Sequence, residues 1–325
     1  MKNNTFVSVL LSAKTKVLKS FRAYPLAFVL LLIVIVVSFL ADNYFSAENI
    51  FNVLRQISVI GILACGMTYV IIAGGIDLSV GAIISFCGAL VINFVTSVGF
   101  IPALLITLSA GGVIGFISGF IITRIRGALG EAFMITFGMQ TVVAAVALIY
   151  TGGIYQQAID NVWFNNMGRG ITPIIIFVVI AALMQFLLTK TRFGRNIYFI
   201  GGNIRAATLS GINVKLIRPL VFMISGVMAG AAGLLLTARV GTASPTAGIG
   251  YELDAIAAVL VGGVSMSGGK GSILNTVLGV VIMGVLGNAL NMMNVSSYPQ
   301  MIIKGVVIVL AVSLDVFNKR REELK

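Results

Sequence analysis

The sequence predicts an all-α integral membrane protein with about ten transmembrane helices. Apolar residues make up 58% of the 325 residues and charged residues only 10%, whereas soluble domains carry about 25% charged residues. The 10 acidic residues and the absence of histidine leave too little polar surface to cover a soluble core. The bases lie between long apolar runs, a pattern typical of proteins surrounded by membrane lipid and not of nucleic-acid-binding proteins.

A transmembrane helix needs about 20 mostly apolar residues, and about ten windows meet or approach this length. The first and eighth windows are the short ones. No small-residue cleavage pattern follows residue 40, so we expect the first window to be retained and not removed as a signal peptide. We interpret residues 1–325 as one transmembrane domain with these windows: 25–40, 53–73, 80–96, 101–123, 132–151, 171–189, 219–238, 249–264, 273–291 and 301–317.

The positions of lysine and arginine predict how the chain is oriented, because these residues stay on the cytoplasmic side when the flanking helices insert. With the N-terminus inside, nearly all of the 22 bases are cytoplasmic, and the exceptions are Arg55, Arg169, Arg239 and Lys304. We therefore expect the N-terminal arm 1–24, the loop 190–218 and the tail 318–325 to be cytoplasmic. This orientation requires the eighth window to cross the membrane.

Two segments interrupt the helical pattern with glycine, at 74–81 (GGIDLSVG) and at 241–254. Glycine and Pro245 disfavour a continuous helix there. Interrupted segments at comparable positions in two halves of a transporter can mark discontinuous helices around a transport path. We therefore expect short or broken helices near 74–81 and 241–264.

Residues for catalysis are not evident in the sequence. Histidine is absent, and Cys65 and Cys87 lie inside apolar runs, where we interpret them as packing residues and not as a disulfide or metal pair. The loop 262–272 (GGVSMSGGKGS) departs from phosphate-binding spacing, because Gly271 follows Lys270 where serine or threonine is needed. We expect no catalytic residue, metal or cofactor in this chain, and we interpret this loop as a flexible cytoplasmic turn.

The loop 190–218 carries start and stop signals for a short helix. Gly201 and Gly202 should break the chain, Asn203 can cap the helix start, and Gly211 suits the left-handed position after its end. Small side chains on such a helix would let another protein approach the backbone closely. A solvated loop whose bases only fix topology is the alternative. The candidate residues for this contact are Gly201, Gly202, Asn203, Ala206, Ala207, Ser210, Gly211 and Ile212.

Several stretches resemble the permeases of ribose-type sugar ABC importers. They are GGIDLSVG at 74–81, GRNIYFIGGNIRAATLSGIN at 194–213, PTAGIGYELDAIAAVLVGGVSMSGGKGS at 245–272 and SSYPQMIIKG at 296–305. The resemblance extends over nearly the whole chain. It implies a multi-pass protein of the bacterial inner membrane that works with a second permease copy or a related permease, an ATPase subunit that binds ATP and Mg, and a periplasmic sugar-binding protein.

The resemblance also implies roles for individual segments. Residues 201–212 would form the coupling helix that docks on the ATPase, and the imported sugar would be ribose or a related monosaccharide.

The broken segment in the second half could form an outer gate, although helix capping explains its acids equally well. The gate candidates are Ser244, Pro245, Thr246, Glu252 and Asp254.

Polar side chains inside the apolar windows are candidates for the translocation path. These are Asn93, Gln140, Asn288 and Asn291, and hydrogen bonding between helices is the other interpretation. Asp77 and Ser79 can cap the helix that follows the first break, or contact the sugar or the ATPase.

An ion-coupled secondary sugar transporter is the alternative function. Such a carrier should hold ionisable residues in mid-membrane. The acidic residues of the predicted membrane region all lie near predicted helix ends, namely Asp77, Glu131, Glu252, Asp254 and Asp315. The sequence therefore favours a permease whose energy comes from a partner, and a membrane enzyme lacks the residues it would need.

Overall fold

A computed structural model of the protein describes residue 35 and the ranges 43–125, 127, 129–157 and 161–323. These residues are mainly helical. The predicted arm 1–24 and nearly all of the first predicted span lie outside the described residues. The described elements are α3 (Ala47–Ile72), α4 (Val80–Ser97), α5 (Phe100–Arg124), α6 (Leu129–Thr151), β1 (Gln156–Gln157), α7 (Val162–Met167), α8 (Thr172–Lys190), α9 (Arg192–Gly202), α10 (Ile204–Leu209), α11 (Val214–Val240), β2 (Thr242–Ala243), α12 (Tyr251–Val261), α13 (Ile273–Met292) and α14 (Ser297–Glu323).

The core lies where α3, α4 and α11 pack together, because most of their side chains are buried. Around them α5, α6 and α8 bury only a narrow stripe and expose apolar side chains outward, as helices in contact with lipid do. The glycine-rich run of α5 packs on α11 with Gly111 directly against the backbone of Gly226. This confirms close helix packing within one subunit. Eight of the described helices are long and apolar enough to cross a membrane.

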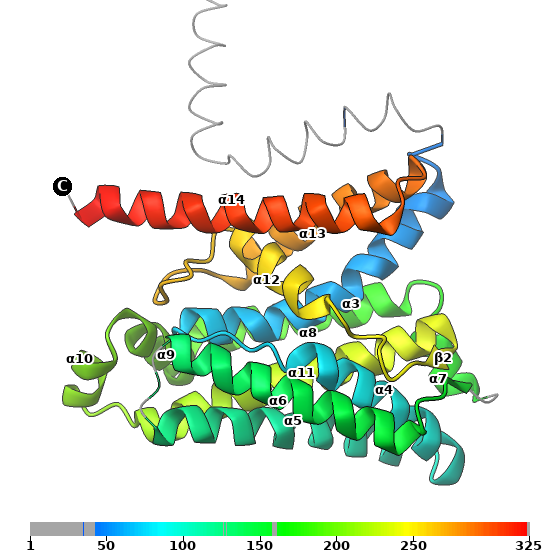
Figure 1. The fold of residues 1–325 in the computed structure, drawn as a ribbon, viewed down its shortest axis with the longest axis horizontal. Helices are drawn as coiled ribbons and strands as arrows, with labels where there is room; N and C mark the ends of the chain where they lie inside the picture. The colour runs from blue at the N-terminus through cyan, green and yellow to red at the C-terminus, as the bar shows by residue number, and fades with distance from the viewer. Residues whose placement is uncertain (1–34, 36–42, 126, 128, 158–160, 324–325) are drawn as a thin grey trace, which may run out of the picture.

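The helices run between two distinct ends of the molecule (Figure 1). One end holds α7 and the short antiparallel pairing of β1 with β2, and we call it the β end. The other holds α9, α10 and the C-terminal part of α14, and we call it the α10 end. Arg55 donates from Nε to the Gly170 carbonyl oxygen at the β end, 3.0 Å away. Arg55 therefore lies at the same end of the molecule as Gly170, the residue that follows Arg169, which agrees with the predicted division of bases.

The eighth crossing is a broken one. The chain leaves α11 at the β end, and α13 begins at the α10 end, where the Gly269 N–H donates to the Ile72 carbonyl oxygen over 2.8 Å. Residues 244–261 must therefore pass from one end to the other. α12 supplies 11 residues of this crossing, about 16 Å of helix, and residues 244–250 cover the rest without regular structure. The predicted break in the second half is confirmed.

The first break is also present, since residues 73–79 between α3 and α4 are not helical. Other boundaries differ from the prediction. α3 and α11 begin several residues before their windows, and α14 continues to Glu323. Polar residues end a membrane window, but they do not end a helix that extends into water. Asp315 consequently lies within α14, so its predicted place near a helix end is wrong.

The predicted loop 190–218 contains two helices, α9 and α10, and the first of these was not predicted. Gly201 and Gly202 form the last turn of α9, so the prediction that they break the chain is wrong. The break comes one residue later, at Asn203, which has extended backbone angles. α9 forms because Phe193, Ile197 and Ile200 recur at helical spacing and place apolar side chains on the protein.

Cysteine labelling can assign the two ends to the two sides of the membrane. The charge rule predicts that the β end is outside. In spheroplasts, a membrane-impermeant thiol reagent should label Tyr155→Cys at the β end and leave Thr208→Cys on α10 unlabelled until the membrane is permeabilised. Both positions are exposed, so access should depend on the membrane alone. The reverse labelling pattern would invert the orientation.

Candidate functional site

The first turn of the half-helix α12 carries two acids with different partners. Glu252 is only 7% exposed. Its Oε1 accepts from Gln140 Nε2 of α6 at 3.2 Å, and its Oε2 accepts from the Gly250 N–H at 3.1 Å. The carboxylate also packs on Gly81 in the first turn of α4. The structure thus joins a predicted gate residue, Glu252, to a predicted path residue, Gln140.

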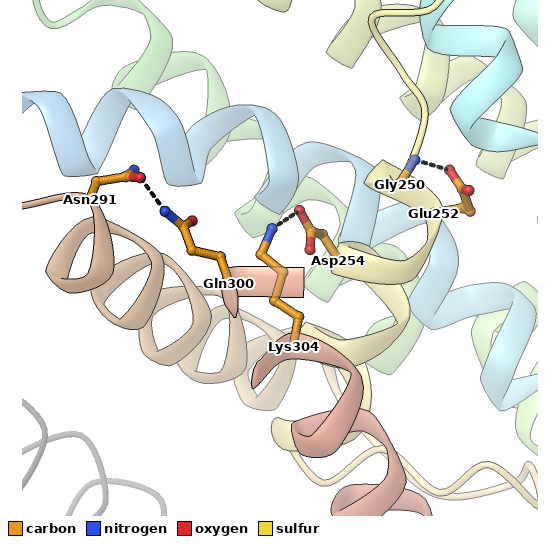
Figure 2. A network of polar contacts seen from close by, with 6 residues as sticks. All are labelled: Gly250, Glu252, Asp254, Asn291, Gln300 and Lys304. Carbon is orange, nitrogen blue, oxygen red and sulfur yellow. Dashed lines mark hydrogen bonds and ion pairs between the residues drawn. The ribbon is translucent and has the colours of Figure 1, made fainter. Parts of the chain in front are cut away.

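Asp254 points to the other side of α12, toward α14 (Figure 2). Its Oδ2 accepts from Lys304 Nζ at 2.8 Å. Side chains of α14 in the range 297–317 that the structure describes include no fully buried one, but Val307, Ile308, Ala311 and Val312 pack against the core half-buried. The ion pair therefore acts together with this apolar packing to position the helix. The two acids together fix the start of α12 between the α4–α6 region and α14.

Charge reversal tests the Asp254–Lys304 pair. Asp254→Lys should lower the thermal stability of the purified protein, because it places two like charges together. The loss should correspond to about 1 kcal/mol, since the pair is partly exposed. Asp254→Lys combined with Lys304→Asp should recover most of that loss. A double variant no more stable than the single one would show that the pair does not hold α14 in place.

The segment before α12 forms a compact turn. Ser244 Oγ and Thr246 Oγ1 are 3.0 Å apart, and the Thr246 N–H donates to Ser244 Oγ. Pro245 between them is buried. Deeper along the segment, the Gly248 N–H donates to Ser85 Oγ of α4 at 2.8 Å. The irregular backbone is therefore held against α4 inside the protein, where a membrane environment requires such backbone to be.

The predicted path asparagines do not form one cluster. Asn93 donates to the Ala89 carbonyl oxygen of its own helix. Asn288 of α13 exchanges amide hydrogen bonds with Asn49 of α3, at 2.8 and 3.2 Å. Asn49 was not predicted because it lies before the apolar window. Hydrogen bonding between helices is therefore the observed arrangement for Asn288.

Asn291 ties α13 to the start of α14. Its Oδ1 accepts from Gln300 Nε2 at 2.8 Å, and Gln300 also donates to the Val295 carbonyl oxygen (Figure 2). Asn291 itself is exposed. This polar contact lies in the same region as the Asp254–Lys304 pair, so both contacts position the first part of α14 (Figure 2).

Asp77 and Ser79 stabilise the first break, but not in the predicted way. Ser79 precedes α4 without a side-chain capping bond. Asp77 is fully buried, and its Oδ1 accepts from both the Ser79 N–H and Ser79 Oγ, at 3.1 and 2.6 Å. Asp77 therefore forms a local turn that sets the direction of the chain into α4.

The predicted coupling segment contains a short capped helix at the α10 end. Asn203 Oδ1 accepts from the N–H groups of Arg205 and Ala206, both at 3.0 Å. Ser210 ends the helix, and Gly211 follows with φ +82°. The Ile212 N–H donates back to the Ala207 carbonyl oxygen. Asparagine at the start and glycine after the end match the predicted capping signals.

The two adjacent alanines of α10 face opposite ways. Ala206 is exposed, whereas Ala207 is 2% exposed and belongs to the apolar core. A partner's contact surface cannot include Ala207, so its predicted place in that surface is wrong. Leu209 was not predicted, although it is 89% exposed. Nothing in its local sequence distinguishes it from an ordinary helix residue.

The side chains described above can form hydrogen bonds and apolar contacts with a substrate or a partner protein. The residues described by the structure include no group of histidine, cysteine, aspartate or glutamate arranged to hold a metal. Cys65 and Cys87 are free and buried. Glu252 starts a half-helix, so it lies within the broken crossing and not at a membrane surface. The position of Glu252 near a helix end therefore does not by itself favour a partner-driven permease over an ion-coupled carrier.

Comparison with known proteins decides the family. A family model described as the permease component of branched-chain amino acid transport systems matches residues 49–312. The chain belongs to this permease family. No solved structure matches it.

Individual relatives match the permease over most of its length. The ribose import permease RbsC of Escherichia coli is 42% identical over 90% of this chain and 92% of its own, and that of Bacillus subtilis is 44% identical over 88% and 90%. The D-allose transport permease AlsC of Escherichia coli is 38% identical over 90% and 91%. The chain is a multi-pass permease of the bacterial inner membrane and not an ATPase.

Proposed function

We propose that this permease forms the membrane path of an ATP-driven importer for ribose or a related monosaccharide. Identity of 42 to 44% to permeases named for ribose, over about nine-tenths of each chain, carries the proposal. Permeases named for D-allose and xylose are 38% and 34% identical. The family model is described by branched-chain amino acid transport, so an amino acid is the competing substrate class.

The test of the substrate is uptake by cells that lack their own ribose permease. The permease is expressed there together with the ATPase and the binding protein of a ribose importer. Radiolabelled ribose should accumulate, and unlabelled ribose should compete better than xylose or allose. Accumulation of leucine, with no sugar taken up, would reject the sugar assignment.

We infer that ATP and Mg are bound by a separate ATPase subunit that docks on α10, and that a periplasmic binding protein delivers the sugar. The α10 helix supports this, since it is capped at both ends and projects Leu209 from the basic end of the molecule. A single exposed leucine is ordinary on a protein surface, so the support comes from its place at the end of a capped helix and not from its exposure alone. A loop whose bases only fix topology would not require a rigid helix with such a tip.

We also propose that two copies of the permease, or this chain and a related permease, enclose the path. The outward part of α14 exposes apolar side chains, and the adjacent Asn291 is exposed as well. Polar groups at membrane depth face cavities or protein partners in preference to lipid. Native mass spectrometry of the purified complex should find two permease chains; one chain per complex would refute the pairing.

A further inference from the structure

The glycine-rich loop 262–272, expected to be a flexible turn, has a fixed backbone. Its Gly269 N–H donates to the Ile72 carbonyl oxygen at the end of α3, over 2.8 Å. The Tyr198 hydroxyl of α9 donates to the Gly271 carbonyl oxygen at 2.7 Å. A phenol is protonated at physiological pH at its ordinary pKa, and burial raises the pKa of Tyr198 further. The loop is thus held by two different helices.

The loop and the end of α9 touch backbone to backbone. A Cβ atom on Gly201 would overlap the Ile72 carbonyl oxygen and lie 2.6 Å from the Gly269 nitrogen. A Cβ on Gly269 would lie 2.9 Å from the Gly202 nitrogen, closer than real Cβ atoms approach. Because no side chain lies between these backbones, a displacement of α9 cannot be absorbed by a change of rotamer. It must move the loop.

The same loop is connected to the transport segments. It begins where α12 ends, at Gly262, and ends at Ser272, which caps α13. Asp315 of α14 accepts through Oδ2 from the Met266 N–H at 3.0 Å and from Ser265 Oγ at 3.3 Å. α14 therefore contacts both ends of the half-helix, through Lys304 at its start and through Asp315 just after its end. One loop joins α9, α12 and α14.

We propose that Tyr198 and Asp315 are positioning residues that make the loop 262–272 the link from the ATPase-docking helix α10, through α9, to the half-helix α12. A movement of α10 then reaches Glu252 through α9, the loop and α12, and α14 moves with them. This inference rests on the proposed function, since it takes the ATPase to act on α10. The proposed role of the loop is mechanical. Its sequence does not indicate this role, because it resembles a phosphate-binding loop but departs from the required spacing.

The test measures how many ribose molecules are imported per ATP hydrolysed. The complete transporter, with its ATPase and binding protein, is placed in proteoliposomes. Tyr198→Phe should lower this ratio about fivefold, the effect of losing one net hydrogen bond from the link. Hydrolysis and the yield of complex should stay near wild type. Tyr155→Phe, the same change at an exposed position of the β end, should leave the ratio unchanged.

Asp315 gives a second variant with a conservative rescue. Asp315→Ala should also lower the ratio, whereas Asp315→Asn retains an acceptor oxygen for the Met266 N–H and should recover most of it. A purely structural role would change the yield of folded complex and not the ratio. Ratios at the wild-type value in both Tyr198→Phe and Asp315→Ala would overturn the proposal.

Spin labels at Thr208→Cys and Ser267→Cys test the link without removing a contact. Both positions are exposed, on α10 and in the loop. Their separation should be the same with ATP bound and without nucleotide, because α10, α9 and the loop move together. A change of several ångströms between the two states would overturn the proposal. A wild-type permease that binds no ATPase would overturn the proposed function itself, and this inference with it.

Discussion

Replacing Leu209 with glutamate should weaken binding of the partner ATPase at least about tenfold, because an exposed apolar side chain of the proposed docking helix is replaced by a charge that would be buried in the contact. The side chain is 89% exposed, so the permease itself should fold as before. The measurement is the yield of ATPase that co-purifies with the tagged permease, together with ATP hydrolysis stimulated by the binding protein.

Val162→Glu is the matched control for Leu209→Glu. Val162 is 73% exposed and lies in α7, another six-residue helix, at the opposite end of the molecule. This variant should bind the ATPase as the wild type does. If both variants retain full ATPase binding and coupled transport, α10 is not the docking site.

Substitutions of the adjacent alanines of α10 test the same docking surface. Ala206→Trp enlarges the exposed face and should block docking while the permease keeps its thermal stability. Ala207→Trp enlarges a buried position and should destabilise the permease itself, by about 1–3 kcal/mol. Loss of docking in Ala207→Trp alone, with Ala206→Trp unaffected, would place the contact surface elsewhere.

Replacing Glu252 with alanine should abolish most transport, the second large effect that we expect. The change leaves the half-buried Gln140 amide and Gly250 N–H without their acceptor, which costs about 1–3 kcal/mol. The start of α12 would then lose its contact with α6. Ribose uptake should fall by at least about tenfold, because alternative positions of this segment become populated.

Glu48→Ala is the matched control for Glu252→Ala. Glu48 also lies in the first turn of a helix, α3, but is exposed. Its replacement removes a similar helix-dipole interaction and should leave uptake close to wild type. Normal uptake by Glu252→Ala at normal expression would show that Glu252 holds no part of the gate.

Long apolar segments were predictable from the sequence, because lipid demands about 20 apolar residues from any helix that crosses. The broken crossing was predictable as well, since Pro245 and its neighbouring glycines disfavour a helix. What could not be predicted was the path of residues 244–250. It depends on contacts with α4, such as the bond from Gly248 to Ser85, which are far apart in sequence.

The candidate sites were predictable only where the signal is local in the sequence. Capping signals at Asn203 and Gly211 act locally, so they located α10 correctly. The partners of Glu252 and Asp254 are not local, and their contacts with Gln140 and Lys304 needed the structure. The sequence predicts a flexible loop at 262–272, because glycine is permissive in isolation. Only the packed fold shows that these glycines serve close backbone contact.

Whether ribose uptake requires ATP hydrolysis distinguishes an ATP-driven permease from an ion-coupled carrier. The permease, its ATPase and its binding protein are reconstituted together in vesicles, and ribose uptake is followed with and without ATP. We expect uptake only when ATP is hydrolysed, and at an unchanged rate after proton and sodium gradients are collapsed. Ribose uptake by the permease alone, driven by an ion gradient without ATP, would contradict the account.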